Sequence, residues 1–327
     1  MSQILSQYYI AGDWGTSNLR LYLCLYQSGK GSSVIDTRYG LGIGQLQRRD
    51  RADSEFETEF FKLSQDWFDQ HGNMPVILSG MVGSTIGWKD APYLDCPVDA
   101  ERIAHGRFSF SARGIDFSVL GGLKTINPLG LPDVMRGEEL QLLGWQLLNS
   151  GLQGDRLFAL PGTHNKWSLC QQHQIKTFLS AFTGELYEIL GKHSILIAQD
   201  SQHQFDEPSF IEGVNTAQKL GQANILHALF SVRSRQVLGE ITAEQSSSYL
   251  SGLIIAADVV GAYQVFNSQY SKDPSNDPLG VTIIGESQLS QNYLLALSQL
   301  GIPAERVEPS IVAIAGFSAI YQYIYDS

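Results

Sequence analysis

Short apolar runs that end in glycine-rich turns recur along the chain and predict an α/β protein. Residues 8–11 (YYIA) are aromatic and aliphatic, which is typical of a buried strand. A small-residue turn follows at 12–18 (GDWGTSN), and residues 19–26 resume the apolar pattern. The chain therefore begins with a predicted β-hairpin, and residues 33–39 can supply a third antiparallel strand.

The next pattern has the period of a helix. Residues 54–70 carry apolar side chains spaced i, i+4, i+7 and i+11, which predicts one buried helical face with Ser54 as a candidate cap. Residues 75–78 (PVIL) then read as a short buried strand. The first part is thus predicted as β-β-β-α-β, a mixed sheet with a crossover helix. The four apolar residues are Phe56, Phe60, Leu63 and Trp67.

A second hairpin is predicted in the other half of the chain. Residues 156–160 (RLFAL) form a buried strand, 161–166 (PGTHNK) a turn, and 167–170 with 175–180 two further strands. A helix is expected to start at Thr183. Other segments predict a strand pair at 108–120, a helix ending near residue 148, helices at 211–231, 243–261 and 288–300, a strand at 281–284, and a strand or helix at 311–325.

Composition narrows the class of protein. The 327 residues suffice for two domains, and 43% hydrophobic with 17% charged residues is typical of a globular chain. A net charge of −11 argues against nucleic acid as the main partner. The three cysteines form no CxxC pair, which favours reduced thiols in a cytoplasm, and no apolar run looks long enough to span a bilayer.

The two hairpin turns are the strongest candidates for chemistry. A strand–turn of this kind presents backbone N–H groups that suit a phosphate, and the lone carboxylate of Asp13 suits a hydrated Mg²⁺. A plain polar turn is the alternative. The pattern recurs, because residues 15–18 (GTSN) match 162–165 (GTHN), each between two strands. Two such turns facing each other across a cleft could hold a nucleotide's phosphate tail from both sides.

Three further segments leave two interpretations open. The loop at 79–97 follows a strand, so Trp88 and Tyr93 either border a small polar ligand or pack within the loop. Acids near a helix start, together with Arg136, indicate either ordinary helix chemistry or a catalytic and anion-binding group. The strand–glycine–helix at Gly285 could cradle an adenosine. The acids are Asp133, Glu138 and Glu139.

Together these blocks resemble the 2-dehydro-3-deoxygalactonokinases, a family in the superfamily of actin, hexokinase and the heat-shock chaperone ATPases. The resemblance rests on GDWGTSNLR, SGMVGSTIGWKDAPYLDCP, DVMRGEELQLLG, LPGTHNKW, FTGELYEILGKHSIL and SYLSGLI, in family order along nearly the whole chain. It implies two ribonuclease-H-like domains, with mixed sheets flanked by helices, at residues 1–153 and 154–327. ATP would bind in the cleft between them, and the last helix could pack back on the first domain.

The resemblance also implies residue roles. Asp13 would hold Mg²⁺ through water, Gly285 would lie at the adenosine end, and Arg136 or Lys166 would meet the substrate carboxylate. The first phosphate loop would be Gly12, Asp13, Trp14, Gly15 and Thr16, and the second Gly162, Thr163, His164 and Lys166. The sugar-acid pocket would be lined by Ser79, Gly80, Met81, Gly83, Trp88 and Tyr93.

The implied reaction is transfer of the ATP γ-phosphoryl group to the C6 hydroxyl of 2-dehydro-3-deoxy-D-galactonate, in galactonate and galactose catabolism. Glu138 is the favoured base, followed by Asp133, by analogy with an acidic block in related phosphatases. The alternatives are a phosphohydrolase of the same fold acting on polyphosphate or guanosine phosphates, and a non-enzymatic nucleotide switch or sugar-sensing regulator. The expected partners are the sugar acid, ATP and Mg²⁺, without nucleic acid or membrane, in a cytoplasmic protein that could form a homodimer.

Overall fold

The computed structural model describes residues 6–46, 53–151, 154–197, 204–271, 279–285 and 287–326. The strands are β1 (Ser6–Trp14), β2 (Asn18–Gln27), β3 (Gly31–Leu41), β4 (Val76–Ser79), β5 (Leu94–Asp95), β6 (Phe108–Ala112), β7 (Ile115–Val119), β8 (Leu123–Ile126), β9 (Pro132–Met135), β10 (Arg156–Leu160), β11 (Asn165–Gln171), β12 (Gln174–Ala181), β13 (Val281–Ile284) and β14 (Ala304–Val307). The helices are α1 (Ile43–Leu46), α2 (Asp53–His71), α3 (Ala100–His105), α4 (Glu138–Leu148), α5 (Thr183–His193), α6 (Glu207–Leu220), α7 (Ile225–Val237), α8 (Ala243–Tyr270), α9 (Gln288–Gln299) and α10 (Pro309–Tyr325), with 3-10 turns at Met81–Gly83 and Gln222–Asn224.

Two sheets share one strand order. The first runs β3-β2-β1-β4-β7-β6, and the second runs β12-β11-β10-β13-β14. In each sheet the first three strands form an antiparallel meander, and two parallel strands follow beside β1 or β10; the first sheet adds β6, which is antiparallel to β7. This repetition confirms the predicted α/β class with two ribonuclease-H-like sheets, and it confirms the predicted β-β-β-α-β start.

The sheets place both hairpin turns at comparable positions. β1 and β10 are the inner strands, and each is followed by a tight turn into an antiparallel neighbour. The parallel neighbours β4 and β13 end beside them, so the loops after those strands lie close to the turns. Ligands of open α/β sheets bind at such carboxyl ends.

A third, three-stranded sheet, β5-β8-β9, was not predicted, and β6 and β7 of the first sheet lie between β5 and β8 in the sequence. Its strands are short, and β5 lies within the segment predicted as an irregular loop. A hydrogen bond from Val98 N to Ile175 O links this region to the second large sheet. Strands this short carry too few residues to show a periodic pattern.

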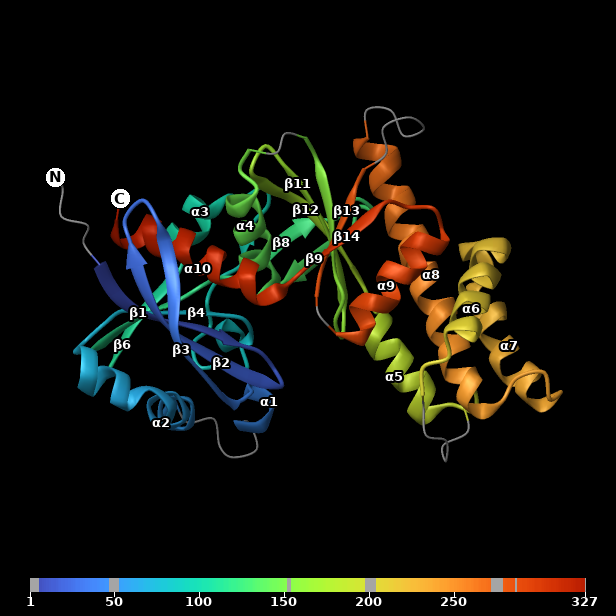
Figure 1. Ribbon diagram of the computed structural model, residues 1–327, viewed down its shortest axis with the longest axis horizontal. Helices are drawn as coiled ribbons and strands as arrows, with labels where there is room; N and C mark the ends of the chain where they lie inside the picture. The colour runs from blue at the N-terminus through green and yellow to red at the C-terminus, as the bar shows by residue number, and fades with distance from the viewer. Residues whose placement is uncertain are drawn as a thin grey trace.

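The core between the large sheets includes α4 and α10 (Figure 1). It combines Tyr9 of β1, Phe158 of β10, Leu142 of α4 and Phe317 of α10. In Figure 1 the red helix α10 returns to the first sheet, so that the chain ends near its beginning. Tyr26 OH donates a hydrogen bond to Asp326 Oδ2 over 2.8 Å, which fixes this return. The predicted domain boundary adjoins residues 152 and 153, which lie outside the described residues, and it stays a prediction.

The structure corrects two predictions about helices and decides between the alternatives of a third. The single helix expected at 211–231 is divided into α6 and α7, because Gly221 ends α6 with φ 73°. Segment 311–325 is helical throughout, within α10. α8 extends to Tyr270, and by length and composition this one helix could span a membrane, although 56% of its most apolar window is buried in the protein. That burial is what a core helix shows.

Candidate active site

The first hairpin turn is narrower than predicted. β1 continues through Trp14, and Gly15 N donates to Asn18 O over 2.9 Å to close the turn. Gly12 therefore lies in the strand, where a Cβ would come within 2.5 Å of Leu78 Cδ2. The side chain of Trp14 is fully buried, and its indole N–H donates to Leu41 O. The side chain of Trp14 is therefore part of the core, and its place in the first phosphate loop stays a prediction that concerns its backbone.

A segment that the sequence left unassigned supports this turn. The backbone N–H groups of Ile43 and Gly44 donate to Gly15 O and Thr16 O over 3.0 and 2.9 Å. Gly42 is packed so closely that a Cβ would lie 2.2 Å from Ser17 C. Gly42 and Gly44 are therefore explained by contact with the turn, whereas a Cβ on Gly40 would meet Leu63 and Glu59 of α2.

Two glycines, Gly80 and Gly137, bring the acidic start of α4 close to Asp13. Gly80 has φ 94°, and a Cβ there would lie 2.9 Å from Trp14 O and 3.3 Å from Asp13 Oδ1. Gly137 has φ 107°, and its Cβ would lie 3.3 Å from Gly80 Cα. Both conformations favour glycine. The end of β4 and the start of α4 therefore converge on Asp13, although the three segments are far apart in the sequence.

Three carboxylates differ in environment at this point. Glu138 is partly exposed, and its Oε2 accepts a hydrogen bond from Arg136 N over 3.0 Å. Burial raises the pKa of Glu138, and the nearby Lys166 ammonium opposes that rise, while Asp13 adds to it. Burial also raises the pKa of Asp13, and Arg20 opposes it. Glu138 is therefore close enough to Asp13 and to Lys166 to be affected by both charges.

Glu139 is fully buried and held in place. Its Oε2 accepts from Gly137 N over 2.7 Å, and Ser79 Oγ lies 3.5 Å from its Oε1. Burial, and next the charge of Glu138, raise the pKa of Glu139 to about 8. Glu139 is therefore protonated at neutral pH, which leaves Glu138 as the member of the pair that can accept a proton.

The protonation of Glu139 predicts a pH dependence of stability. Its pKa rises from 4.5 in the unfolded chain to about 8, so its stabilising effect is complete below pH 4.5 and is lost as the pH rises through 8. Glu139→Gln keeps the neutral form at every pH. We expect its thermal midpoint to fall less than that of the wild type between about pH 5 and about pH 9. Calorimetry at both pH values measures this, with Glu101→Gln on the exposed face of α3 as control. If the thermal midpoints of Glu139→Gln and of the wild type fell by the same amount between these two pH values, the prediction would be contradicted.

Asp133 does not join this group. Its carboxylate accepts from Ser180 N over 2.8 Å and from Ser180 Oγ over 2.6 Å. Asn127 Nδ2 donates to it over 3.2 Å. These bonds tie β9 to β12, and they occupy the oxygens that a base would need. We therefore assign Asp133 a structural role, contrary to the sequence expectation.

Gly83 and Tyr93, two of the residues predicted to line a sugar-acid pocket, lie against Arg136. Arg136 is 9% exposed, its guanidinium lies over the ring of Tyr93, and its Nη2 donates to Ala91 O over 2.9 Å. Among the described residues, its Nε and Nη1 have no hydrogen-bond partner. Gly83 lies against it, since a Cβ there would approach Nη1 to 2.8 Å. Met81 is half-buried beside this group, in the turn after β4.

Trp88 is a core residue, which corrects its placement in the pocket. It is 4% exposed and packs against Trp14, Phe60 and Phe117, with ring centroids 6.2, 6.3 and 5.1 Å away. Tyr93 is 38% exposed and keeps one ring face on Arg136. The aromatic residue that can meet a ligand here is therefore Tyr93.

The second turn is fixed by the start of α5. Glu185 N donates to Thr163 O over 2.9 Å, and a Cβ on Gly184 would lie 2.4 Å from Gly162 O. His164 Nε2 lies 2.6 Å from Glu185 Oε2. Its ring stacks on Phe182 with centroids 5.4 Å apart. His164 is thus held by residues of its own hairpin and helix.

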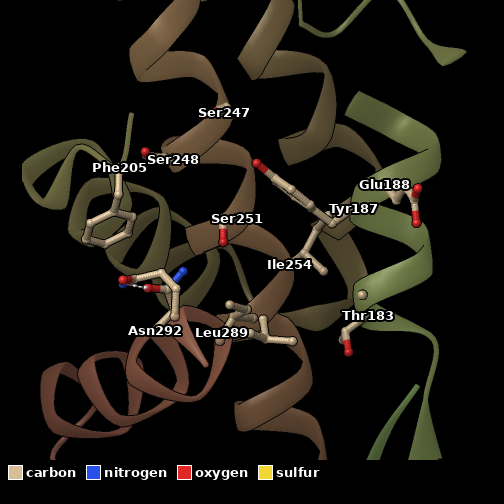
Figure 2. A pocket seen from close by; sticks show the side chains of 13 residues that line it. Thr183, Tyr187, Glu188, Phe205, Ser247, Ser248, Ser251, Ile254, Leu289 and Asn292 are labelled. Atoms are coloured by element: carbon tan, nitrogen blue, oxygen red, sulfur yellow. Dashed lines mark hydrogen bonds between the residues drawn. The ribbon is translucent and has the colours of Figure 1, made fainter. Parts of the chain in front are cut away.

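A cavity of about 430 Å³ lies beyond this turn (Figure 2). Tyr187 of α5, Ile254 of α8 and Leu289 of α9 supply apolar surface, and Ser251 and Asn292 supply polar groups. Its volume and mixed lining are typical of a small-molecule site. Sequence reasoning found only the edge of this cavity. The reason is that its walls come from three helices that are far apart in the chain.

Gly285 lies between the second turn and this cavity. A Cβ there would come within 2.0 Å of Ser290 Oγ and within 4.0 Å of Pro161 Cδ. Gly285 N donates to Val307 O over 3.2 Å, which continues the parallel pairing of β13 with β14. The position admits only glycine without a shift of α9.

The oxygen ligands present suit a cation that keeps most of its water. Within the described ranges, no three His, Cys, Asp or Glu side chains form a metal-binding group. Asp13 and Glu138 instead offer carboxylates at the same point. Mg²⁺ is usually bound by one or two carboxylates together with substrate phosphates. The residues therefore fit a magnesium–nucleotide complex better than a metal cage.

The chain is similar to proteins of one family along nearly its whole length. The family described as "2-keto-3-deoxy-galactonokinase" matches residues 13–320. The chain is 31% identical over 313 residues to the 2-dehydro-3-deoxygalactonokinase of Escherichia coli K12, covering 95% of this chain and 97% of the relative. A crystal structure from Sinorhizobium meliloti, solved as a candidate 2-dehydro-3-deoxygalactonokinase, superposes with a TM-score of 0.81. It has 29% identity, and the match covers 98% of this chain and 100% of that one.

Proposed function

The chain belongs to the 2-keto-3-deoxy-galactonokinase family, and from this premise we propose that it phosphorylates 2-dehydro-3-deoxy-D-galactonate at the C6 hydroxyl with ATP. Membership makes the chain a sugar-acid kinase. The observation that carries the residue assignments is the convergence of Asp13, Glu138 and Lys166 beside two hairpin turns.

The phosphate tail would lie between the two turns. Backbone N–H groups at the first turn, around Gly15 and Thr16, would face the terminal phosphates. The second turn, around Gly162 and Thr163, would hold them from the other sheet. Phosphoryl transfer depends mainly on positioning and on neutralising charge, which backbone donors and a lysine provide. Lys166 would supply the cationic side chain, and His164 would border the same loop.

Mg²⁺ would be held by Asp13 through water, together with the phosphate oxygens. When bound, it would neutralise charge on the phosphates. Arg20, which pairs with Asp13 across β1 and β2, offsets the burial of the Asp13 carboxylate. Asp13 would thus remain ionised for this task.

Glu138 would accept the proton of the C6 hydroxyl. The bond from Arg136 N to Glu138 Oε2 fixes its orientation, and Lys166 favours its ionised form. The neutral Glu139 behind it adds no second negative charge. The two neighbouring carboxyl groups would thus have different roles because their environments differ: Glu138 would be the ionised base, and Glu139 would stay neutral.

The sugar acid would lie over the segment after β4. Ser79, Gly80, Met81 and Gly83 supply a narrow wall, and Tyr93 covers one side. The substrate carboxylate would meet Arg136, whose Nε and Nη1 have no hydrogen-bond partner among the described residues, or Lys166. Because Arg136 is 9% exposed, this contact would need the loop around Tyr93 to move on binding.

The adenosine would occupy the cavity beyond the second turn. Gly285 would border its ribose side, and Tyr187, Ile254 and Leu289 would pack on the base (Figure 2). We further propose that residues 1–153 and 154–327 act as two domains that close on the substrates in the cytoplasm, with small molecules as partners and a homodimer as a candidate assembly. Closure would exclude water from the transfer.

A coupled ADP-release assay tests the function. Mg-ATP would be combined with the keto-deoxy acids derived from galactonate and gluconate, with galactonate, and with common hexoses. Turnover confined to the galactonate-derived keto-deoxy acid is expected. ADP release that needs no sugar would replace the kinase with a phosphohydrolase acting on polyphosphate or guanosine phosphates. The absence of turnover together with nucleotide binding would favour a switch or sensor.

A further inference from the structure

A partly buried carboxylate on α8, that of Asp258, lies behind the second turn, outside the groups discussed so far. Asp258 accepts three hydrogen bonds, from Asn165 Nδ2 over 2.8 Å, Trp167 Nε1 over 2.9 Å and Tyr293 OH over 2.5 Å. Trp167 and Tyr293 are fully buried in the same core. A buried carboxylate is tolerated where its oxygens are bonded in this way.

The three donors belong to elements that surround the proposed nucleotide. Asn165 is the first residue of β11 and directly follows the turn, and Trp167 comes two residues later. Tyr293 lies on α9, whose residues Leu289 and Asn292 line the cavity. The side chain of Asp258 therefore connects the second turn to α8 and α9, which form two walls of the cavity.

The network extends to α5. Tyr293 OH lies 3.1 Å from Thr183 Oγ1, and since the phenol proton goes to Asp258, the threonine hydroxyl donates to the phenol oxygen. Thr183 begins α5, and the following Gly184 touches Gly162 O. Both sides of the second turn, the strand after it and the helix beneath it, are thus held through Asp258.

We propose that Asp258 is the positioning residue of the second phosphate loop, and that its ionised carboxylate, through Tyr293, sets the loop's geometry for ATP. The proposal rests on the function proposed above for that loop. An ionised carboxylate accepts all three donors, whereas a protonated one must turn a proton toward one of them. Loss of the charge would therefore release Asn165 or Tyr293.

The titration of this group gives the test a distinct readout. Burial raises the pKa of Asp258 to about 6, and the bonds from Tyr293, Asn165 and Trp167 oppose the rise. Tyr293 is the titratable side chain that faces it, and burial, followed by the charge of Asp258, keeps the pKa of this phenol well above its usual value. Over the range where Asp258 titrates, Tyr293 stays neutral.

The experiment combines kinetics and spectroscopy on the full chain. In Tyr293→Phe the KM for ATP should rise about tenfold, the effect of losing one hydrogen bond to a charged group, with little change in the KM for the sugar acid. The rise of this KM on acidification, centred near pH 6 in wild type, should move to higher pH because the bond that lowers the pKa of Asp258 is gone. Asp258→Asn should raise this KM at every pH and abolish that step. Tyr263→Phe, on the same helix, is the matched control and should leave the KM unchanged.

The indole N–H signal of Trp167 provides a second measurement on the wild type itself. Among the five tryptophans, its ¹H–¹⁵N peak should shift as the pH passes about 6, and the shift should be absent in Asp258→Asn. An unshifted Trp167 peak, or an unchanged KM for ATP in folded Tyr293→Phe, overturns the positioning role while the kinase stands. If calorimetry detects no Mg-ATP binding to the wild type, the proposed function of the loop fails instead. Should both variants fail to fold, the wild-type Trp167 titration decides.

Discussion

Glu138→Gln is expected to lower kcat by a factor of about 10² to 10⁴, the usual contribution of a positioned general base. The KM for ATP should stay within a few-fold of wild type, because glutamine retains an oxygen for the Arg136 N–H bond, here 3.0 Å long. The substitution slows the phosphoryl-transfer step itself, so single-turnover rates should fall as well as steady-state rates. Stopped-flow measurement of ADP formation with saturating Mg-ATP and the sugar acid checks this.

Two variants separate this role from its alternatives. Asp133→Asn removes part of the link to Ser180, so it should lower the thermal midpoint while kcat stays within about tenfold. Glu101→Gln, exposed on α3, should change neither quantity. If Asp133→Asn abolished turnover in a folded protein and Glu138→Gln did not, the base would have to be reassigned.

Asp13→Asn is expected to raise the Mg²⁺ concentration for half-maximal activity by about 10- to 100-fold, as when a ligand's outer-sphere partner is lost. The physical reason is the loss of the charge that would hold the hydrated ion beside the phosphates. Burial raises the pKa of Asp13, so the neutral amide should cost the fold nothing and the thermal midpoint should hold or increase. Magnesium titrations of the ADP-release rate, with calorimetry of the folded protein, measure both effects.

Asp116→Asn is the matched control for that variant. Asp116 is exposed on β7, and its Oδ1 accepts from Ser111 Oγ over 2.7 Å, away from the turns. Its magnesium requirement should equal that of the wild type. An equal requirement in Asp13→Asn would remove Asp13 from the metal site and leave the cation to the phosphates and Glu138.

The sequence by itself determined both hairpins and most long helices. Strands β10 and β13 have the predicted bounds, because uninterrupted apolar runs between turn residues are local signals. The matching segments GTSN and GTHN lie at the same place in both sheets, in the turn between two antiparallel strands, as predicted. The short polar strand β14, and α1 within the glycine-rich segment, carry no such pattern and were missed.

The tertiary structure alone decided which candidates share a site. Nothing in the local sequence shows that Gly80 and Gly137 pack together and bring Glu138 to Asp13, or that Asp133 bonds to Ser180 instead. Trp88 looked like a ligand contact because its neighbours are loop residues, yet its indole ring fills the core under the first sheet. Which side chains face a ligand depends on contacts between distant segments. Hydrophobic periodicity in the sequence predicts which face of a helix or strand is buried, and the packing of the elements decides which residues that face contacts.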